Sequence, residues 1–428
     1  MRRTPLLAAA LLVLAAACSS SKDAASPVVD SPREVVVDVP LHDELSASAI
    51  RRKTMLGALQ YLPEDGDAGW VNIAVDIPVT GRYRTEIVGV GGTGTLWVED
   101  YVENGDGRTY DVTGPIEVDV PLPAGERTPG LETVGRDGSP LREGRHRMRV
   151  HFTGPSFLMG SVRFTLLREH RDTPETLTQA MDGDGEWALV WADEFDGEGV
   201  PDPAKWTHDL GNWGWGNREP QYYTSSDPDN ARQEDGFLII EARPDDDGHA
   251  WTSARLTTRA KVSFLRGRFV IRAKVPAADG VWAAGWTLGD EYRDEISWPY
   301  CGEIDVMEAV GREIDDATGD GVNHASCHTR AYYFKQGNHI SNTIEVAGMS
   351  KEFHDYVCEW DEDEVRMYVD DTHYYTYDKK ESEFAWPFDR PQNLILNLAM
   401  GGGMGGDIAP GIGPQRVIVD HVRVYERR

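Results

Sequence analysis

Hydrophobic and polar residues alternate along the first part of the chain in short stretches that end at turn residues. Between residues 71 and 77, valine and isoleucine occupy every second position, and the stretch ends at Pro78. Residues 116–120 and 148–152 alternate in the same way. A period of two residues sends successive side chains to opposite faces of a β-strand, whereas a helix needs a period of 3.6. The pattern therefore predicts strands from about residue 35 to residue 167.

Turn signals divide these predicted strands at short intervals. Gly91-Gly92, Asn104-Gly105 and Asp137-Gly138 are dipeptides of the kind that form tight turns. Many short strands at this spacing are typical of a β-sandwich. We therefore assign residues 35–167 to a first, smaller β-sandwich domain.

A charged segment rich in Gly and Asp, residues 168–186, interrupts the strand pattern and predicts a linker. Strand patterns resume at Trp187, so residues 187–428 are predicted to form a second and larger all-β domain. Eleven of the thirteen tryptophans lie in this second part. Some of them must pack in a core, but so many aromatic residues also suit a groove that stacks sugar rings.

The N-terminus is predicted to be a targeting signal. Two arginines precede an apolar run at residues 6–17, which is too short to span a bilayer. The run ends in Leu14-Ala-Ala-Ala-Cys18 and resembles the lipobox of bacterial lipoproteins, which implies removal of residues 1–17 and lipidation of Cys18. Ala15 stands where that pattern usually has Leu, and Ala15-Ala-Ala17 also fits an ordinary signal-peptidase site. Both routes predict export, either to the cell envelope or outside the cell, and the first makes residues 18–34 a lipid-anchored tether.

The charge of the chain narrows its expected partners. It contains 72 acidic and 43 basic residues, a formal net charge of −29. The electrostatic field of so negative a chain repels phosphate backbones, so we expect no nucleic-acid partner. For the same reason, a neutral polysaccharide is a more natural ligand than an acidic one. We expect contact with a membrane only through the lipid anchor, and the sequence does not indicate an oligomeric state.

The cysteines do not form a disulfide framework. Cys301, Cys327 and Cys358 remain beside Cys18, and no two cysteines have Cys-x-x-Cys spacing. Because three cysteines remain and none has that spacing, we expect buried thiols and neither a disulfide framework nor a zinc site. A bridge between Cys301 and Cys327 is the alternative.

Three carboxylates lie within six residues in the segment Glu303-Ile-Asp-Val-Met-Glu308. In a strand Glu303 and Asp305 share a face, while Glu308 would point to the opposite face unless a single β-bulge, most simply at Met307, returns it. Retaining glycosidases need an ionised carboxylate as nucleophile and a protonated carboxyl group as acid. Exposed strand faces also carry acidic residues, so the spacing alone leaves the function open.

The same segment resembles the Glu-x-Asp-x-x-Glu signature of glycoside hydrolase family 16, in the form of its laminarinase-like endo-β-1,3-glucanases. The resemblance covers residues 187–428 through an ordered series of motifs that includes Trp191-Ala-Asp-Glu-Phe195, Glu219-Pro-Gln-Tyr-Tyr-Thr224, Asn397-Leu-Ala-Met-Gly-Gly402 and Val419-Asp-His-Val-Arg-Val-Tyr425. It implies a concanavalin A-like β-jelly-roll sandwich with a glycan-binding cleft, and no cofactor for catalysis.

Carried onto this chain, the resemblance implies that Glu303 is the nucleophile, Asp305 an assisting carboxylate and Glu308 the general acid/base. Position matching places substrate contacts at four further residues, Asn217, Arg255, Trp282 and Trp286. We add Trp298 as a wall of the cleft and His328 as a neighbour of Asp305 or of the substrate. Burial in the core is the alternative for each tryptophan, and a structural role for the histidine. The tryptophan that is common after the Asn-Leu-Ala-x-Gly-Gly pattern is absent, with Met404 nearby.

Many members of that family bind a structural calcium ion. The matching ligands here are the carboxylate of Asp420 and the backbone carbonyl groups of Glu194 and Gly236, and oxygen ligands suit calcium. The first domain weakly resembles carbohydrate-binding modules of the family 6 type. Trp70, Trp97 and Tyr101 are candidates for its sugar-stacking face, and a plain spacer sandwich is the alternative.

The leading prediction is a retaining, endo-acting hydrolase that cleaves β-1,3 or mixed β-1,3/1,4 glucans such as laminarin by double displacement. One alternative is a hydrolase of β-galactans such as agar or carrageenan, or a transglycosylase, of the same family. The alternative from another class is a non-catalytic glycan-binding protein.

Overall fold

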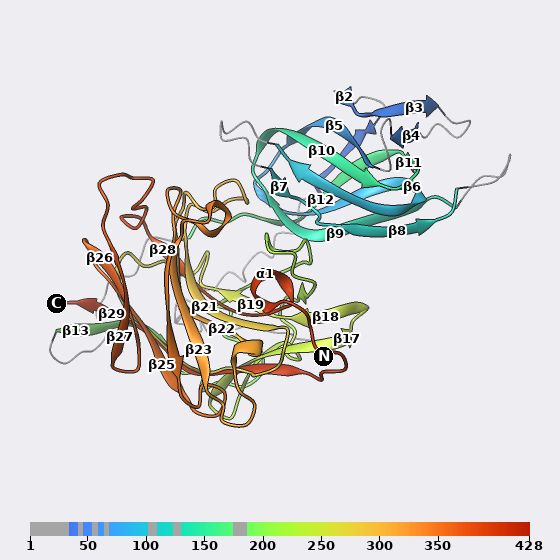
Figure 1. The fold of residues 1–428 in the computed structure, drawn as a ribbon. Coiled ribbons are helices and arrows are strands. Elements are labelled where there is room, and N and C mark those ends of the chain that lie inside the picture. The colour runs from blue at the N-terminus through green and yellow to red at the C-terminus, as the bar shows by residue number, and fades with distance from the viewer. Residues whose placement is uncertain are drawn as a thin grey trace, which may run out of the picture. The chain divides into compact units, whose positions relative to one another are not determined.

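The computed structural model describes residues 34–41, 46–53, 59–63, 68–101, 109–122, 130–173 and 186–428. The predicted signal sequence, Cys18 and most of the predicted linker lie outside these residues. Residues Glu34–Arg428 form one compact unit that contains two large, separate hydrophobic cores. Nearly all its regular structure is strand (Figure 1), which confirms the all-β prediction.

The first core is surrounded by the strands at the blue-to-green end of the ribbon in Figure 1. These strands are β1 (Val36–Pro40), β2 (Ser46–Ala47), β3 (Ala49–Lys53), β4 (Leu59–Pro63), β5 (Ala68–Ile77), β6 (Gly81–Asp100), β7 (Tyr110–Asp111), β8 (Ile116–Val120), β9 (Glu132–Leu141), β10 (Gly144–Thr153), β11 (Phe157–Met159) and β12 (Ser161–Glu169). The alternation in β5 has the predicted effect, because its hydrophobic residues Val71, Ile73, Val75 and Ile77 are all buried in this core.

Strand β6 connects the layers of this first sandwich. Its first half pairs with β9 and β12, and its second half pairs with β8 and β10. The register with β9 shifts between Val88 and Val90, where Gly89 has a positive φ of 72°. Glycine adopts this conformation without the steric cost that a side chain would add, so one long strand can serve both layers.

The second part of the chain contains two antiparallel sheets and one short parallel pair. Its strands are β13 (Trp187–Asp193), β14 (Thr207–Asp209), β15 (Tyr222–Tyr223), β16 (Ala231–Glu234), β17 (Phe237–Asp246), β18 (His249–Ser253), β19 (Arg255–Thr257), β20 (Gly267–Lys274), β21 (Val281–Gly289), β22 (Glu303–Val310), β23 (Gly321–His328), β24 (Ile340–Val346), β25 (His354–Trp360), β26 (Glu364–Val369), β27 (Thr372–Asp378), β28 (Gln392–Met400) and β29 (Gln415–Arg427). Short helical turns are η2 (Gly311–Glu313), η3 (Phe334–Gln336) and α1 (Gly402–Gly405).

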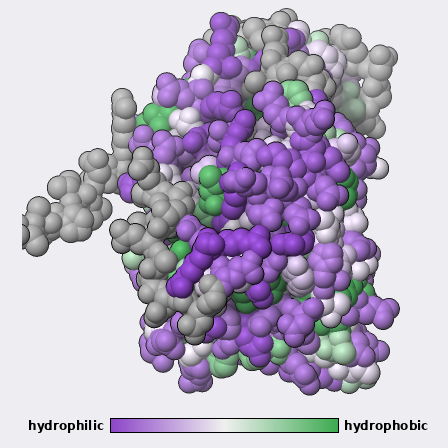
Figure 2. All heavy atoms as spheres, turned by 90° about the vertical axis from the view of Figure 1, so that its left-hand side faces the viewer, coloured by the Kyte–Doolittle hydropathy of each residue, from purple (hydrophilic) through white to green (hydrophobic). Residues whose placement is uncertain are grey.

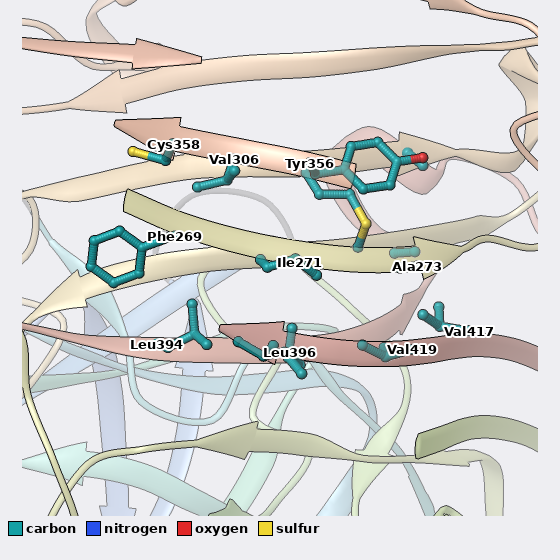
Figure 3. Close-up of a cluster of buried hydrophobic side chains, with 14 of the residues drawn as sticks. Phe269, Ile271, Ala273, Val306, Tyr356, Cys358, Leu394, Leu396, Val417 and Val419 are labelled. Carbon is teal, nitrogen blue, oxygen red and sulfur yellow. The ribbon is translucent and has the colours of Figure 1, made fainter. Parts of the chain in front are cut away.

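The two sheets of this part enclose the second core. One sheet follows the order β14-β19-β28-β21-β22-β23-β24, and the other follows β15-β18-β17-β29-β20-β25-β26-β27. Figure 3 shows side chains from both sheets meeting between them, with Leu394 and Leu396 from β28 near Ile271 from β20. The hydrophobic residues of β22, including Ile304 and Val306, also face this core. Burial of one face of β22 fixes which of its residues point away from the core.

The three cysteines that the structure describes, Cys301, Cys327 and Cys358, are free and buried. The Cys301–Cys327 bridge is therefore not formed, and the prediction of buried thiols is confirmed. In the described part of the chain, no helix is both apolar and long enough to cross a membrane. Hydrophilic residues cover most of the face drawn in Figure 2, where hydrophobic side chains form only small separate patches.

Candidate active site

The three predicted carboxylates lie along strand β22. Asp305 pairs with Ser326 of β23 and Glu308 pairs with His324, so Val306 and Met307 together lie opposite Ala325 alone. This two-against-one arrangement is a β-bulge. It buries both bulged residues in the core and returns Glu308 to the face that carries Asp305. The predicted bulge is thus present, and it involves Val306 as well as Met307.

Each carboxylate accepts a hydrogen bond from one side chain on a neighbouring element. The indole Nε1 of Trp298 donates to Glu303 Oε2 at 2.9 Å, and that of Trp282 donates to Glu308 Oε1 at 3.1 Å. The hydroxyl group of Ser326 donates to Asp305 Oδ2 at 2.6 Å. Two tryptophans that sequence reasoning placed either at the cleft or in the core therefore hold the outer carboxylates in position. Trp298 also packs in a small apolar cluster, so it fills both roles.

His328 lies opposite Glu303 on strand β23, which is next to β22 as predicted. Its Nε2 atom is 3.4 Å from Asp305 Oδ2, 3.9 Å from Glu303 Oε1 and 3.2 Å from the hydroxyl oxygen of Ser326. Burial lowers the pKa of His328 to about 3, so the imidazole is neutral at neutral pH. It therefore contributes hydrogen bonding rather than a positive charge to this group.

Burial also raises the pKa of all three carboxyl groups. The pKa of Asp305 rises to about 7 because it loses hydration, although the hydrogen bond from Ser326 opposes this rise. The pKa values of Glu303 and Glu308 rise well above the usual range, first through lost hydration and then through the negative charge of Asp305. Neighbouring carboxylates in a dry site cannot all ionise at neutral pH, so the three share fewer than three negative charges.

The outer two carboxyl groups differ in how well their ionised forms are supported. The hydrogen bond from Trp298 and the positive charge of Arg255 both lower the pKa of Glu303. For Glu308, the hydrogen bond from Trp282 has that effect. The negative charge of Glu308 acts in the opposite direction and raises the pKa of Glu303, so the two glutamates titrate as a coupled pair and not independently.

These side chains line a cleft of about 380 Å³. All six of the other predicted contact residues, Asn217, Arg255, Trp282, Trp286, Trp298 and His328, line the same cleft. Trp286 donates its Nε1 hydrogen to Asn397 Oδ1 at 2.7 Å, and the Asn397 amide donates to the hydroxyl oxygen of Tyr223 at 3.1 Å. The arrangement of aromatic faces and fixed polar groups is typical of a carbohydrate site.

Sequence reasoning missed several lining residues. Ser326 lies two positions before His328 on one strand, so the period of two could have indicated it. Phe334, on turn η3, is 43% exposed, and its ring centre is 5.7 Å from that of Trp298. Lys335 holds its Nζ atom 5.4 Å from the same Trp298 ring. A three-residue turn leaves no periodic signal, and nothing in the sequence pattern marks this pair.

Two of the three predicted calcium ligands, Asp420 and Glu194, carry side chains that contact arginines. Asp420 Oδ2 lies 3.2 Å from Nε of Arg272, and both oxygens of Glu194 accept hydrogen bonds from Arg423. The guanidinium of Arg272 beside the Asp420 carboxylate disfavours a divalent ion, whereas Arg423 contacts the side chain of Glu194 and not its predicted carbonyl ligand. The calcium site therefore stays a prediction. Among the described residues, the side chains grouped closely enough to hold a metal are Glu303, Asp305 and His328, and these line the cleft described above.

The three aromatic candidates of the first sandwich lie on a face where other side chains already stack on them. The guanidinium of Arg149 lies 4.2 Å from the ring centre of Trp70 and 4.3 Å from that of Tyr101. Trp97 stacks on His151 with the ring centres 4.7 Å apart. One face of each ring is therefore covered, and the role of this domain in sugar binding stays a prediction.

A β-sandwich whose cleft holds two glutamates and an aspartate on one strand, among tryptophan rings, has the architecture of a glycoside hydrolase. The profile of the glycosyl hydrolases family 16 matches residues 218–418. The beta-glucanase of Rhodothermus marinus is 45% identical over 249 residues, which span 56% of this chain and 85% of that relative. The chain therefore belongs to glycoside hydrolase family 16.

Solved structures give the same family. The laminarinase of Rhodothermus marinus is 43% identical with a TM-score of 0.53, and the match covers 56% of this chain and 98% of that one. A mutant of a non-specific endo-β-1,3(4)-glucanase from the family is 34% identical with a TM-score of 0.53, over 58% of this chain and 98% of that one. That mutant was co-crystallised with 1,3-β-D-cellotriosyl-glucose and presents 1,3-β-D-cellobiosyl-glucose at its active site.

Proposed function

We propose that this chain hydrolyses β-1,3-glucans, or mixed β-1,3/1,4-glucans, at internal linkages and with retention of anomeric configuration. The observation that carries the proposal is the row of Glu303, Asp305 and Glu308 on one face of β22, inside a cleft with tryptophan walls. The glucanase and laminarinase relatives support a glucan as the substrate.

The reaction follows two displacements. The Glu303 carboxylate attacks the anomeric carbon while the bond from that carbon to the leaving sugar oxygen breaks, and Glu308 gives its proton to that oxygen. Glu308, now ionised, then takes a proton from a water molecule. The resulting hydroxide attacks the same carbon, and the bond to Glu303 breaks. Burial, and after it the negative charge of Asp305, raises the pKa of Glu308, so Glu308 regains a proton between cycles.

The charge of the cleft favours a neutral glycan over a sulfated one. Besides the catalytic carboxyls, Glu219 and Glu295 line the cleft, whereas its cations are Arg255 and Lys335. Burial raises the pKa of Glu219 to about 7, so this group adds partial negative charge near neutral pH. Sulfate groups would meet more carboxyl groups than cations there, which counts against carrageenan-type substrates.

The test is the release of reducing ends from laminarin, lichenan, agarose and carrageenan, with Glu303→Gln as the matched inactive control. We expect rapid, Glu303-dependent release from laminarin and lichenan. Release from a galactan alone would retain the mechanism and overturn the substrate. If laminarin binds but is not cleaved, the glycan-binding alternative replaces the enzyme.

We also propose that the protein is exported and held at the cell envelope by a lipid on Cys18. The support is the apolar run of residues 6–17 before a small-residue cleavage motif. Mass spectrometry of the protein from the native host should find a diacylglyceryl group on Cys18, and Cys18→Ala should release the activity into the medium. An unmodified mature N-terminus in the wild type would instead support the ordinary signal-peptidase site.

A further inference from the structure

An arginine of the first sandwich reaches the sheet that carries the cleft. Arg82, on β6, donates from Nη2 to Oδ1 of Asp209 on β14 at 2.8 Å, and from Nη1 to the carbonyl oxygen of Gly138 at 3.0 Å. Arg82 is 9% exposed and Asp209 is 6% exposed. A buried, charge-assisted bond of this kind fixes the orientation of both partners.

The second oxygen of the same aspartate faces the cleft arginine. Oδ2 of Asp209 forms an ion pair with Nε of Arg255 at 3.2 Å, and Arg168 of β12 lies 3.4 Å from Oδ1. Burial alone would raise the pKa of Asp209, but the charges of Arg82, Arg255 and Arg168 lower it below the usual range. Asp209 therefore stays ionised and connects Arg82 to Arg255 through one rigid carboxylate.

Arg255 in turn lies against two tryptophans of the cleft. Its guanidinium carbon is 4.9 Å from the ring centre of Trp215 and 4.7 Å from that of Trp286. The guanidinium of Arg82 lies 5.1 Å from the same Trp215 ring. Trp215, Trp286 and Arg255 all line the cleft, so the arrangement links β6 of the first sandwich to the substrate-facing surface.

The backbones beside this link fit together closely. The amide hydrogen of Asn212 is donated to the Asp137 carbonyl oxygen at 3.0 Å, and the Asn212 side-chain oxygen accepts from the Asp137 amide at 3.2 Å. A Cβ atom added to Gly138 would lie 2.1 Å from the carbonyl oxygen of Leu210. Only a glycine at position 138 permits this close approach. Leu210 directly follows β14, the strand that carries Asp209. The first sandwich thus holds this strand end by backbone as well as by side chain.

We propose that Arg82 is a positioning residue for the substrate cleft, which acts through Asp209 to hold Arg255 against Trp215 and Trp286. The first sandwich is then a component of the glycan site and not a separate appendage. This inference rests on the proposed glucan substrate. Without Arg82, Asp209 loses its shortest charged contact and Arg255 regains side-chain freedom, so ordering Arg255 on the substrate becomes part of the cost of binding.

The test measures binding of a β-1,3-linked gluco-oligosaccharide by calorimetry, in the full chain with Glu303→Gln to prevent turnover. We expect Arg82→Met to raise Kd by roughly tenfold, the size of one weakened charged contact. Arg255→Met should raise Kd at least as much, and the double variant should be no worse than Arg255→Met alone, because the two residues act as one unit. Independent, additive effects would overturn the proposal.

Arg142→Met is the matched control, since it removes another ion pair between the two sandwiches, with Asp294 at 3.2 Å. It should leave Kd unchanged, and an equal loss in both variants would mean that Arg82 only holds the sandwiches together. Arg82→Lys keeps the positive charge but loses the two-pronged guanidinium group, so its Kd should lie between those of the wild type and Arg82→Met. If Arg82→Met does not fold, an unchanged Kd for Arg82→Lys would overturn the proposal. Wild-type chain that neither cleaves nor binds the glucan would refute the proposed function instead.

Discussion

The two sandwiches use the same alternation of residues in opposite ways. In β8 of the first sandwich, buried and exposed residues alternate at every position. In β28 of the second, all nine residues are buried, and in β22 every residue except Glu303 is buried. Polar residues on the outer face of β8 therefore meet water, whereas Glu303, Asp305 and Glu308 of β22 and Asn397 of β28 line one cleft. The same strand pattern yields a hydrated surface in one region and a largely buried row of carboxyl groups in the other.

Removal of water, and not the presence of acids, distinguishes β22 from β8. Asp119 and Glu117 of β8 are also acids two positions apart on one face, but both are exposed. Asp305 is buried beside other carboxyls, and its pKa rises to about 7. Substitutions in β22 and matched substitutions elsewhere in the chain should therefore separate effects on turnover from effects on stability.

The largest effect is expected at the proposed acid. Glu308→Ala should lower the turnover of laminarin by roughly 10²–10⁴-fold, because the leaving sugar oxygen then receives no proton in the transition state. Aryl glycosides with good leaving groups should lose far less. Glu359→Ala, which removes a carboxylate from the other sheet, serves as the control and should retain activity. Azide rescue of Glu308→Ala that gives an inverted product would contradict the double displacement.

The next largest effect is expected from a matched pair of core substitutions, one in each sandwich. Ile304 and Ile73 are equally buried, one in each core. Either change to alanine should lower the free energy of unfolding by about 2–5 kcal/mol through the lost contacts and the cavity. Only Ile304→Ala should also lower kcat, since Ile304 sits between Glu303 and Asp305 on β22. Chemical denaturation and kinetics on both variants test this, and equal kcat values would show that the strand tolerates the cavity.

A change at Asp305 should move the pH profile. The negative charge of Asp305 raises the pKa of both Glu303 and Glu308. In Asp305→Asn both pKa values fall, so both limbs of the kcat/KM profile should shift to lower pH, on a reduced maximum. Asp100→Asn, at a similarly buried aspartate of the first sandwich, should leave both limbs in place. A shift to higher pH would contradict the electrostatic role given to Asp305.

The smallest effect is expected on stability. The folded pKa of Asp305, about 7, exceeds its usual value of 3.8, so the folded state holds the proton more tightly than the unfolded state. The wild type therefore loses stability as pH rises from about 4 to 7, and this loss is complete above pH 7. Asp305→Asn should raise Tm at pH 8, by about 2–4 °C per kcal/mol recovered, and the gain should vanish near pH 3.5. An equal gain at both pH values would exclude titration as its cause.

The sequence predicted the strands and the catalytic row because both depend on local periodicity. Alternation identified β5 and β10, and the five-residue offset of Glu308 required a bulge that the structure contains. The hydrogen bonds that Trp282 and Trp298 donate were not predictable, since they depend on how distant segments meet. Asp209 gave no signal at all, as its role arises from arginines that lie far away along the chain.

The predicted calcium site shows what a position-by-position resemblance leaves out. The resemblance transfers oxygen ligands from position to position, but it does not report what else approaches them. In this chain, Arg272 and Arg423 lie against the carboxylates of Asp420 and Glu194. The positive charge beside these two carboxylates is supplied by side chains, and only three-dimensional contacts reveal it.

The bulge on β22 also determines how this strand should respond to the loss of a residue. Val306 and Met307 share one partner position, opposite Ala325, while Asp305 and Glu308 keep regular partners on either side. Deleting one bulged residue would leave an ordinary ladder in which both acids still face the cleft. We therefore expect this strand to tolerate the loss of one residue, with altered twist and altered spacing between nucleophile and acid.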